Sequence, residues 1–301
     1  MPPKKARRAV RKGTKPPPDE PPVLIAGDGL ARQHVKYPVK KAQVDAYTVM
    51  KPARKGDDSK RKLVVLLTDV HGWRDADNRL AADRFAFATS AVVVMPDLHR
   101  GRPFEGKGRR YTPKEYEVWR KANADDKRVE YDIVSAIRYA IAEHKPSSYA
   151  IAGFSYGAGR ALELACKTRE HDAMTPPGPL ALGRDARLAA VVAFYPTRHD
   201  PLYIGTTIAA PLCGLFAGLD EIPGARAEDC EVLTKCLATN HFIKTFHVQS
   251  FPRGHGFVHT SVPTYFPGDE ASTYASRDEQ EDAEAAFVVA TSWLSLHLGS
   301  S

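Results

Sequence analysis

A serine stands between two glycines in the segment Gly153-Phe154-Ser155-Tyr156-Gly157, and this G-x-S-x-G pattern is typical of an exposed nucleophile. The apolar run 149–152 before it predicts a buried strand, and the stretch 158–167 after it predicts a helix. A sharp turn between strand and helix projects the serine hydroxyl, and glycine on either side avoids collisions with the neighbouring backbone. Without this context, a chance match that serves only as structural punctuation would be an equal alternative. With it, we predict that Ser155 is a nucleophile.

A serine hydroxyl needs a general base, which in turn is oriented by an acid. In chains with this turn the order along the sequence is nucleophile, acid, base. Asp220 follows the predicted strand 211–217, and His255 lies in a Gly-His-Gly turn after the predicted strand 243–249. The sequence therefore predicts Ser155, Asp220 and His255 as catalytic residues. A surface turn is the structural alternative for Asp220, and Glu221 stands next to it.

Acyl transfer also requires backbone N–H groups that stabilise the oxyanion of the intermediate. The residue after the nucleophile, Tyr156, is expected to supply one of them. The second is expected from the loop that follows the predicted strand 63–68. In this loop Val70 is the first candidate and His71 the second.

His255 and His259 have the H-x-x-x-H spacing that binds zinc when both side chains lie on one face of a helix. Glycines on both sides of His255 argue against a helix at this point. We therefore expect no metal site, and nothing in the sequence calls for a cofactor.

Short apolar strands alternate with amphipathic helices from about residue 43 onward. This alternation predicts an α/β fold with a mostly parallel, doubly wound sheet flanked by helices. Ligands in such sheets bind beyond the carboxyl ends of the strands, where the three predicted catalytic residues are placed. The expected strands are 44–50, 63–68, 91–95, 148–153, 188–194, 211–217 and 243–249, and the expected helices are 75–88, 114–144 with a break near 124, 157–168 and 278–298.

The amino-terminal 40 residues are rich in Pro, Lys and Arg and lack apolar periodicity, so we predict a disordered tail over 1–40 and one domain over 41–299. Residues 1–22 carry seven basic and two acidic side chains, which accounts for most of the net charge of +7. The domain itself is close to neutral, which makes nucleic-acid binding by the domain unexpected. The basic run 4–15 is interpreted as a solubilising or targeting segment; a nuclear import signal or a phosphate-binding arm is the alternative.

The four cysteines are scattered and no apolar secretory segment is present, which indicates a cytoplasmic protein, with nuclear import through the tail as the alternative. The longest uncharged stretch, 201–219, contains Pro211 and several glycines. We interpret it as loop and strand, so no membrane contact is expected. The sequence makes no prediction about the oligomeric state.

Six further segments of the chain form a recognisable set: Asp69-Val70-His71-Gly72, Pro96–Gly101, Tyr116–Trp119, Ala136–Ala140, Phe216–Asp220 and Gly254–Phe257. Together they resemble the dienelactone hydrolase family of α/β-hydrolases, also called carboxymethylenebutenolidase-like proteins. The resemblance implies the α/β-hydrolase fold and cofactor-free hydrolysis of esters and lactones through an acyl-enzyme. It also implies that the backbone of Val70 and Tyr156 forms the oxyanion hole and that Asp69 is the acidic residue near the nucleophile.

Three positions depart from the best-known members of that family. Ser155 stands where they carry Cys, which favours a general serine esterase because serine depends fully on its base. Asp69 stands where they carry Glu, and His259 stands where they carry an Arg for the substrate carboxylate. The segment 100–114 is rich in Arg and Lys, and we hypothesise that Arg109 and Arg110 bind an anionic substrate group; a solvated surface loop is the alternative.

The sequence thus predicts a serine hydrolase whose partner is a small carboxylic ester or lactone. Its expected substrate-binding residues are Asp69, His71, Arg109 and Arg110. A catalytically silent α/β-hydrolase scaffold used for binding is the first alternative. A peptidase would share the triad, but no additional domain to gate a peptide is evident.

Overall fold

The computed structural model describes residues 29–39, 42–52, 61–106, 112–172, 186–259 and 276–299. Strands and helices alternate along most of this length. The strands are β1 (Ala31–Val39), β2 (Ala42–Met50), β3 (Leu63–Leu67), β4 (Val92–Pro96), β5 (Ser148–Phe154), β6 (Arg187–Phe194), β7 (Leu212–Ala217) and β8 (Phe246–Phe251), and the helices are α1 (Ala76–Thr89), α2 (Pro113–Asn123), α3 (Asp126–His144), α4 (Ser155–Asp172), α5 (Pro201–Thr207), α6 (Ala227–Thr239) and α7 (Arg277–Leu298).

The eight strands form one sheet in the order β1-β2-β4-β3-β5-β6-β7-β8. The pairs β1–β2 and β2–β4 are antiparallel, and all other neighbouring strands are parallel. Every residue of β3, β4, β5 and β7 is buried, as expected for parallel strands covered on both faces. The predicted mostly parallel, doubly wound sheet is therefore confirmed.

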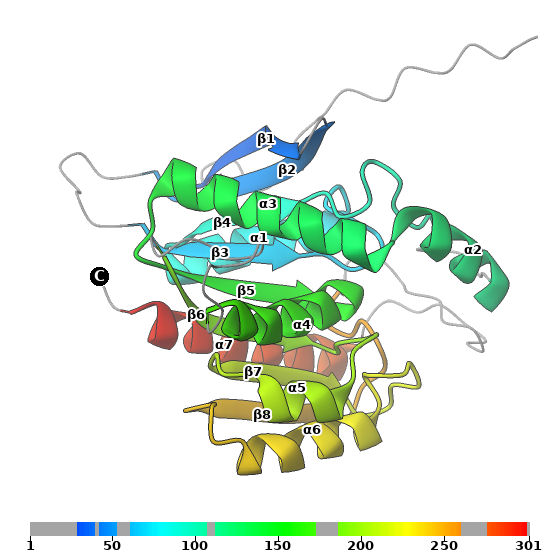
Figure 1. Ribbon diagram of the computed structural model, residues 1–301. Coiled ribbons are helices and arrows are strands. Elements are labelled where there is room, and N and C mark those ends of the chain that lie inside the picture. The colour runs from blue at the N-terminus through cyan, green and yellow to red at the C-terminus, as the bar shows by residue number, and fades with distance from the viewer. Residues whose placement is uncertain are drawn as a thin grey trace, which may run out of the picture.

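Helices cover both faces of this sheet (Figure 1), and a separate hydrophobic cluster fills the space on each side. On the face toward the viewer, α3, α4, α5 and α6 contribute buried apolar side chains to the first cluster. On the opposite face, α1 and α7 contribute to the second. Because β3 to β8 are joined by parallel pairs, their carboxyl ends lie at one edge of the sheet. The loops that carry the predicted site residues lie together at this edge.

The sheet begins earlier in the chain than the sequence indicated, and the predicted boundary at residue 40 is corrected to lie before Ala31. Basic residues and Pro38 conceal an alternation in β1, where Tyr37 and Val39 are buried and Lys36 and Pro38 are exposed. A proline is tolerated here because β1 is the edge strand. Residues 1–28, including the basic run, lie outside the described part of the chain.

Two helices were also missed, and one predicted break is confirmed. The stretch 201–219, interpreted as loop and strand, begins with the helix α5, whose first N–H groups bond to the side chain of Asp200. The helix α6 was assigned no structure. The expected interruption near residue 124 separates α2 from α3, because Asp125 accepts the N–H of Arg128 and starts a new helix.

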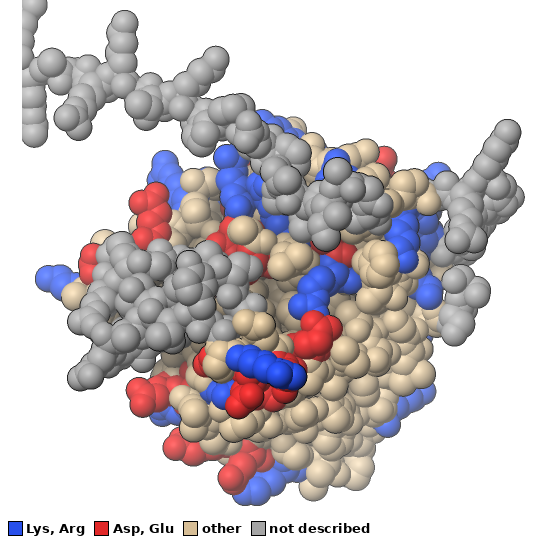
Figure 2. All heavy atoms as spheres, turned by 180° about the vertical axis from the view of Figure 1, so that it is seen from behind, with Lys and Arg blue, Asp and Glu red and all other residues tan. Residues whose placement is uncertain are grey.

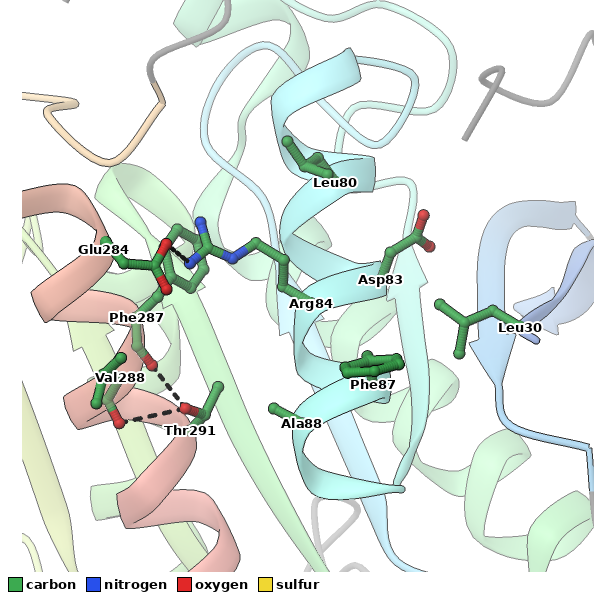
Figure 3. A pocket seen from close by; sticks show the side chains of 10 residues that line it. All are labelled: Leu30, Leu80, Asp83, Arg84, Phe87, Ala88, Glu284, Phe287, Val288 and Thr291. Carbon is green, nitrogen blue, oxygen red and sulfur yellow. Dashed lines mark hydrogen bonds and ion pairs between the residues drawn. The ribbon is translucent and has the colours of Figure 1, made fainter. Parts of the chain in front are cut away.

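The face formed by α1 and α7 carries an open groove, which is separate from the predicted site. Positively and negatively charged side chains lie interspersed over this side of the molecule (Figure 2). The groove has a volume of about 390 Å³, and Arg84 of α1 reaches Glu284 of α7 across it (Figure 3). None of the predicted site residues lines it. Among the described residues, no helix is both long and apolar enough to span a membrane.

Candidate active site

Ser155 lies at an abrupt change from strand to helix. Strand β5 ends at Phe154, and α4 begins at Ser155 with no connecting loop. Ser155 has a φ of 49°, a left-handed conformation that costs energy in a residue with a side chain. Its carbonyl accepts the N–H of Thr197 at 3.1 Å, which ties the turn to the segment after β6. The turn therefore has the strained geometry expected of a nucleophile elbow.

The two glycines of the motif are required by close backbone approaches. A Cβ atom at Gly157 would lie 2.4 Å from the carbonyl oxygens of both Leu67 and Thr68 at the end of β3. A Cβ atom at Gly153 would lie 2.7 Å from the backbone N of Ala158. The expected collisions at both positions are confirmed, and the first turn of α4 lies directly against the end of β3.

We expect Gly157→Ala to lower the free energy of unfolding by about 3 kcal/mol, because the added methyl group meets backbone that can move only with the sheet. Gly254→Ala is the matched control, since a Cβ atom there would have nothing within 4 Å. Its expected effect is within about 0.5 kcal/mol. Urea unfolding of both variants measures the difference. Equal stabilities would contradict the steric account of the motif.

His255 lies between the serine and an aspartate. Its Nε2 atom is 2.8 Å from Ser155 Oγ, and its Nδ1 atom is 2.5 Å from Asp220 Oδ2. Because an ionised carboxylate only accepts hydrogen bonds, Nδ1 carries the proton and donates to Asp220. Nε2 is then the acceptor for the serine hydroxyl. The structure thus brings the three predicted residues together in the order that proton removal from Ser155 requires.

The loop that follows β7 is hydrogen-bonded to the end of β8 and the loop after it, which holds Asp220 beside His255. The N–H of Gly218 donates to the carbonyl of Phe251 at 2.6 Å, and the N–H of Leu219 donates to that of Arg253 at 2.9 Å. Asp220 Oδ1 accepts the N–H of Ile222 at 2.9 Å, so its other oxygen is left for His255. The neighbouring Glu221 is exposed. The geometry therefore selects Asp220 over Glu221 as the partner of the histidine.

The loop after β3 lies beside the elbow, as the oxyanion prediction requires. Its Val70 is half-buried, and the carbonyl of Val70 accepts the N–H of Phe104 at 2.8 Å. The ring of Tyr156 is buried and its hydroxyl donates to Asp126 at 3.1 Å, so only the backbone of Tyr156 is available near Ser155. A backbone N–H in the first turn of a helix has no acceptor within that helix. The expectation for Val70 and Tyr156 therefore stays a prediction that this arrangement favours.

Asp69 and His71 have internal partners in the same loop. Asp69 Oδ1 accepts the N–H of His71 and the side-chain amide of Asn78, both at 2.9 Å, and Oδ2 is 3.4 Å from Nδ1 of His259. His71 Nδ1 is 3.1 Å from the carbonyl oxygen of Phe104. Burial by itself would raise the pKa of Asp69, but the charge of His71 and hydrogen bonds from His259 and Asn78 hold it well below its usual range. The carboxylate is therefore ionised at neutral pH.

We expect Asp69→Asn to lower the free energy of unfolding at pH 7 by about 2 kcal/mol, because hydrogen bonds to a charged acceptor contribute about 1.5–3 kcal/mol. The folded-state pKa of Asp69 lies below its unfolded value of about 4, so its ionisation stabilises the fold above that pH. This contribution is lost as the pH falls below 4. Urea unfolding at pH 7, 5 and 3 should show that the difference in free energy of unfolding between the wild type and Asp69→Asn becomes smaller as the pH falls. A difference in free energy of unfolding that stays constant down to pH 3 would contradict the lowered pKa of Asp69.

Comparisons with known proteins find the family that the sequence resembles. The sequence model of the dienelactone hydrolase family matches residues 179–297, the part of the chain that holds Asp220 and His255. A carboxymethylenebutenolidase homolog of Xenopus tropicalis is 24% identical over 238 residues, which cover 78% of this chain and 86% of that protein. The resemblance to the dienelactone hydrolase family is confirmed.

Solved structures show the same fold. A putative dienelactone hydrolase from Klebsiella pneumoniae is 18% identical with a TM-score of 0.64, and the match covers 88% of this chain and 98% of that one. The esterase Pf2001 of Pyrococcus furiosus is 12% identical with a TM-score of 0.58, covering 90% and 94%. The expectation of an α/β-hydrolase fold is confirmed.

The structure adds Tyr195 to the surroundings of Ser155, His255 and Asp220. Its ring meets that of His255 edge-on, with centroids 4.9 Å apart, and burial raises the pKa of its hydroxyl well above the usual value. Tyr195 directly follows the predicted strand 188–194, so it occupies the same kind of position as Asp220 and His255. That position is the signal by which sequence reasoning could have found it.

The predicted anion-binding residues Arg109 and Arg110 lie outside the described part of the chain. Of the same segment, Arg100 is described and is engaged elsewhere: it forms hydrogen bonds of 3.0 and 2.7 Å to the two carboxylate oxygens of Asp132 in α3. Asp132 also binds Arg128 at 2.7 Å. Arg100 therefore supports the fold, and the hypothesis that Arg109 and Arg110 bind an anionic substrate group stays a prediction.

Proposed function

We propose that this chain is a serine hydrolase that cleaves a carboxylic ester or lactone through an acyl-enzyme on Ser155. One observation carries the proposal. His255 joins Ser155 Oγ at 2.8 Å to Asp220 at 2.5 Å, at a strand-to-helix turn of the α/β-hydrolase sheet. The family match supports ester chemistry in particular.

Acylation begins when Ser155 Oγ attacks the carbonyl carbon of the substrate while His255 Nε2 takes its proton. The imidazolium that forms is stabilised by Asp220, which stays ionised. The carbonyl oxygen becomes an oxyanion and receives hydrogen bonds from the backbone N–H groups of Tyr156 and Val70. When the intermediate collapses, His255 donates this proton to the leaving alcohol. In a lactone that alcohol remains attached to the acyl group.

Deacylation repeats these steps with water as the nucleophile. His255 Nε2 removes a proton from water, which attacks the carbonyl carbon of the acyl-enzyme. The second tetrahedral intermediate uses the same two N–H donors. Its collapse releases a carboxylic acid and returns the proton to Ser155 Oγ. His255 thus passes the proton of Ser155 to the leaving alcohol and the proton of water to Ser155, so the cycle needs no other proton donor or acceptor.

Hydrolysis of p-nitrophenyl acetate, p-nitrophenyl butyrate and a simple lactone tests the proposal. We expect the wild-type protein to cleave at least one of them and Ser155→Ala to lose that activity. Ser135→Ala is the matched control, because Ser135 donates only to the carbonyl of Tyr131 within α3. A wild-type protein inert to all three would favour the silent scaffold, and cleavage confined to peptides would favour a peptidase.

A further inference from the structure

A second histidine–aspartate contact lies beside the triad and has no part in the proton transfers. His259, four residues after the base, places Nδ1 3.4 Å from Oδ2 of Asp69 at the end of β3. The two side chains are 4% and 9% exposed. A buried contact between these groups joins the loop that carries His255, residues 252–259 (the base loop), to residues 69–72 (the oxyanion loop).

We propose that His259 is a positioning residue whose contact with Asp69 clamps the base loop to the oxyanion loop. The inference rests on the proposed function, because it assigns a task within that site. Within the described part of the chain, neither side chain is hydrogen-bonded to Ser155 or His255. Their task is to keep His255 and the N–H of Val70 at a constant separation from Ser155.

On the side of the base loop, His259 is held by its backbone and its ring. Its N–H donates to the carbonyl of Gly256 at 2.9 Å, which closes a turn that starts directly after His255. Its ring packs on that of Phe154, the residue before the nucleophile, with centroids 4.6 Å apart. A shift of His259 would therefore be transmitted to the base and to the elbow.

On the side of the oxyanion loop, the two oxygens of Asp69 have separate tasks. Oδ1 accepts the N–H of His71 and the amide of Asn78, which sets the shape of the loop around Val70. Oδ2 faces His259. Asp69 thus fixes the oxyanion loop through Oδ1 and contacts His259 through Oδ2.

Only one nitrogen of the His259 ring has a polar partner within the described part of the chain. Nδ1 faces Asp69, whereas Nε2 is buried without a hydrogen bond. A phenylalanine would keep the packing on Phe154 and lose only the contact with Asp69. The substitution His259→Phe therefore isolates the clamp from the packing of the ring.

We expect His259→Phe to lower kcat for the best ester about 10- to 100-fold with KM changed less than twofold, since a misplacement of about 1 Å can cost that much in rate. Asp69→Asn should lower kcat similarly, and the double variant should be no worse than the poorer single variant. His259→Gln, which can still donate to Asp69, should recover part of the loss. Hydrogen exchange at residues 69–72 should be faster in His259→Phe than in the wild type.

His34→Phe is the matched control. His34 also contacts an aspartate, Asp45 at 3.0 Å, and packs on an aromatic ring, Trp73 at 4.9 Å, but it lies on the edge strand β1. The kcat of His34→Phe and the hydrogen exchange of its residues 69–72 should match those of the wild type. If His259→Phe folds and has the kcat and the hydrogen exchange of the wild type, the clamp is overturned. If it fails to fold, wild-type kcat and exchange in both His259→Gln and Asp69→Asn would overturn the clamp. Exchange needs no substrate, so it separates failure of the clamp from failure of the proposed function.

Discussion

Replacing His255 with Ala is expected to lower kcat for the best ester by about 10⁵-fold or more while KM changes little, because the triad acts as a unit and loses its base. His255 is the only described group within hydrogen-bond distance of Ser155 Oγ. Without it the hydroxyl keeps its proton at neutral pH and is a weak nucleophile. Steady-state hydrolysis at pH 7.5, with Tm measured alongside, gives the result.

The control for this variant is His247→Ala. His247 lies on β8, the strand that leads to the base loop, and its ring contacts the side chain of Gln249 at 3.2 Å. It has no contact with the triad among the described residues. We expect its kcat to stay within about threefold of the wild type, as for a substitution remote from the chemistry. Equal losses in the two variants would mean that the effect comes from the fold of this region and not from the base.

Asp220→Asn is expected to lower kcat by about 10⁴-fold, the second largest effect. The amide has nearly the shape of the carboxylate, so the loop should remain folded. Its NH₂ group, however, can donate to Nδ1 of His255 and stabilise the tautomer that carries its proton on Nε2. That tautomer cannot accept the proton of Ser155. The loss should therefore appear in kcat, with KM and Tm close to the wild type.

Glu221→Gln is the control that distinguishes the two neighbouring acids. Glu221 is exposed, whereas the carboxylate of Asp220 is buried against His255 and its own turn. Its replacement should leave kcat unchanged within about twofold, because a single exposed charge contributes little. A large loss in Glu221→Gln with none in Asp220→Asn would reverse the assignment of the acid.

Most of the sheet was predictable because its strands are short apolar runs with clear ends. Strands such as β3 and β5 are buried on both faces, so their sequences carry no polar interruption. The strand β1 was missed because only Tyr37 and Val39 are buried in it, and its exposed positions carry polar residues and Pro38. The helix α6 was missed because only Leu233 and Leu237 are buried in it, too few to show a helical period.

The triad was predictable for a different reason, which is its chain order. The three residues lie 35 to 100 positions apart, but each follows a predicted parallel strand, and such strands end at one edge of the sheet. The surroundings were not predictable in this way. The contacts of Tyr195 with His255 and of His259 with Asp69 depend on how loops pack on one another, which no spacing in the sequence records.

The central claim is a covalent bond between substrate and Ser155, and intact-mass measurement after treatment with a fluorophosphonate tests it most directly. The probe reacts with an activated serine and stays attached. We predict one adduct per chain, located on Ser155 by peptide mapping and absent from Ser155→Ala, with full labelling of Ser135→Ala. An adduct on another residue, or an unlabelled wild-type protein that still hydrolyses esters, would contradict the serine acyl-enzyme.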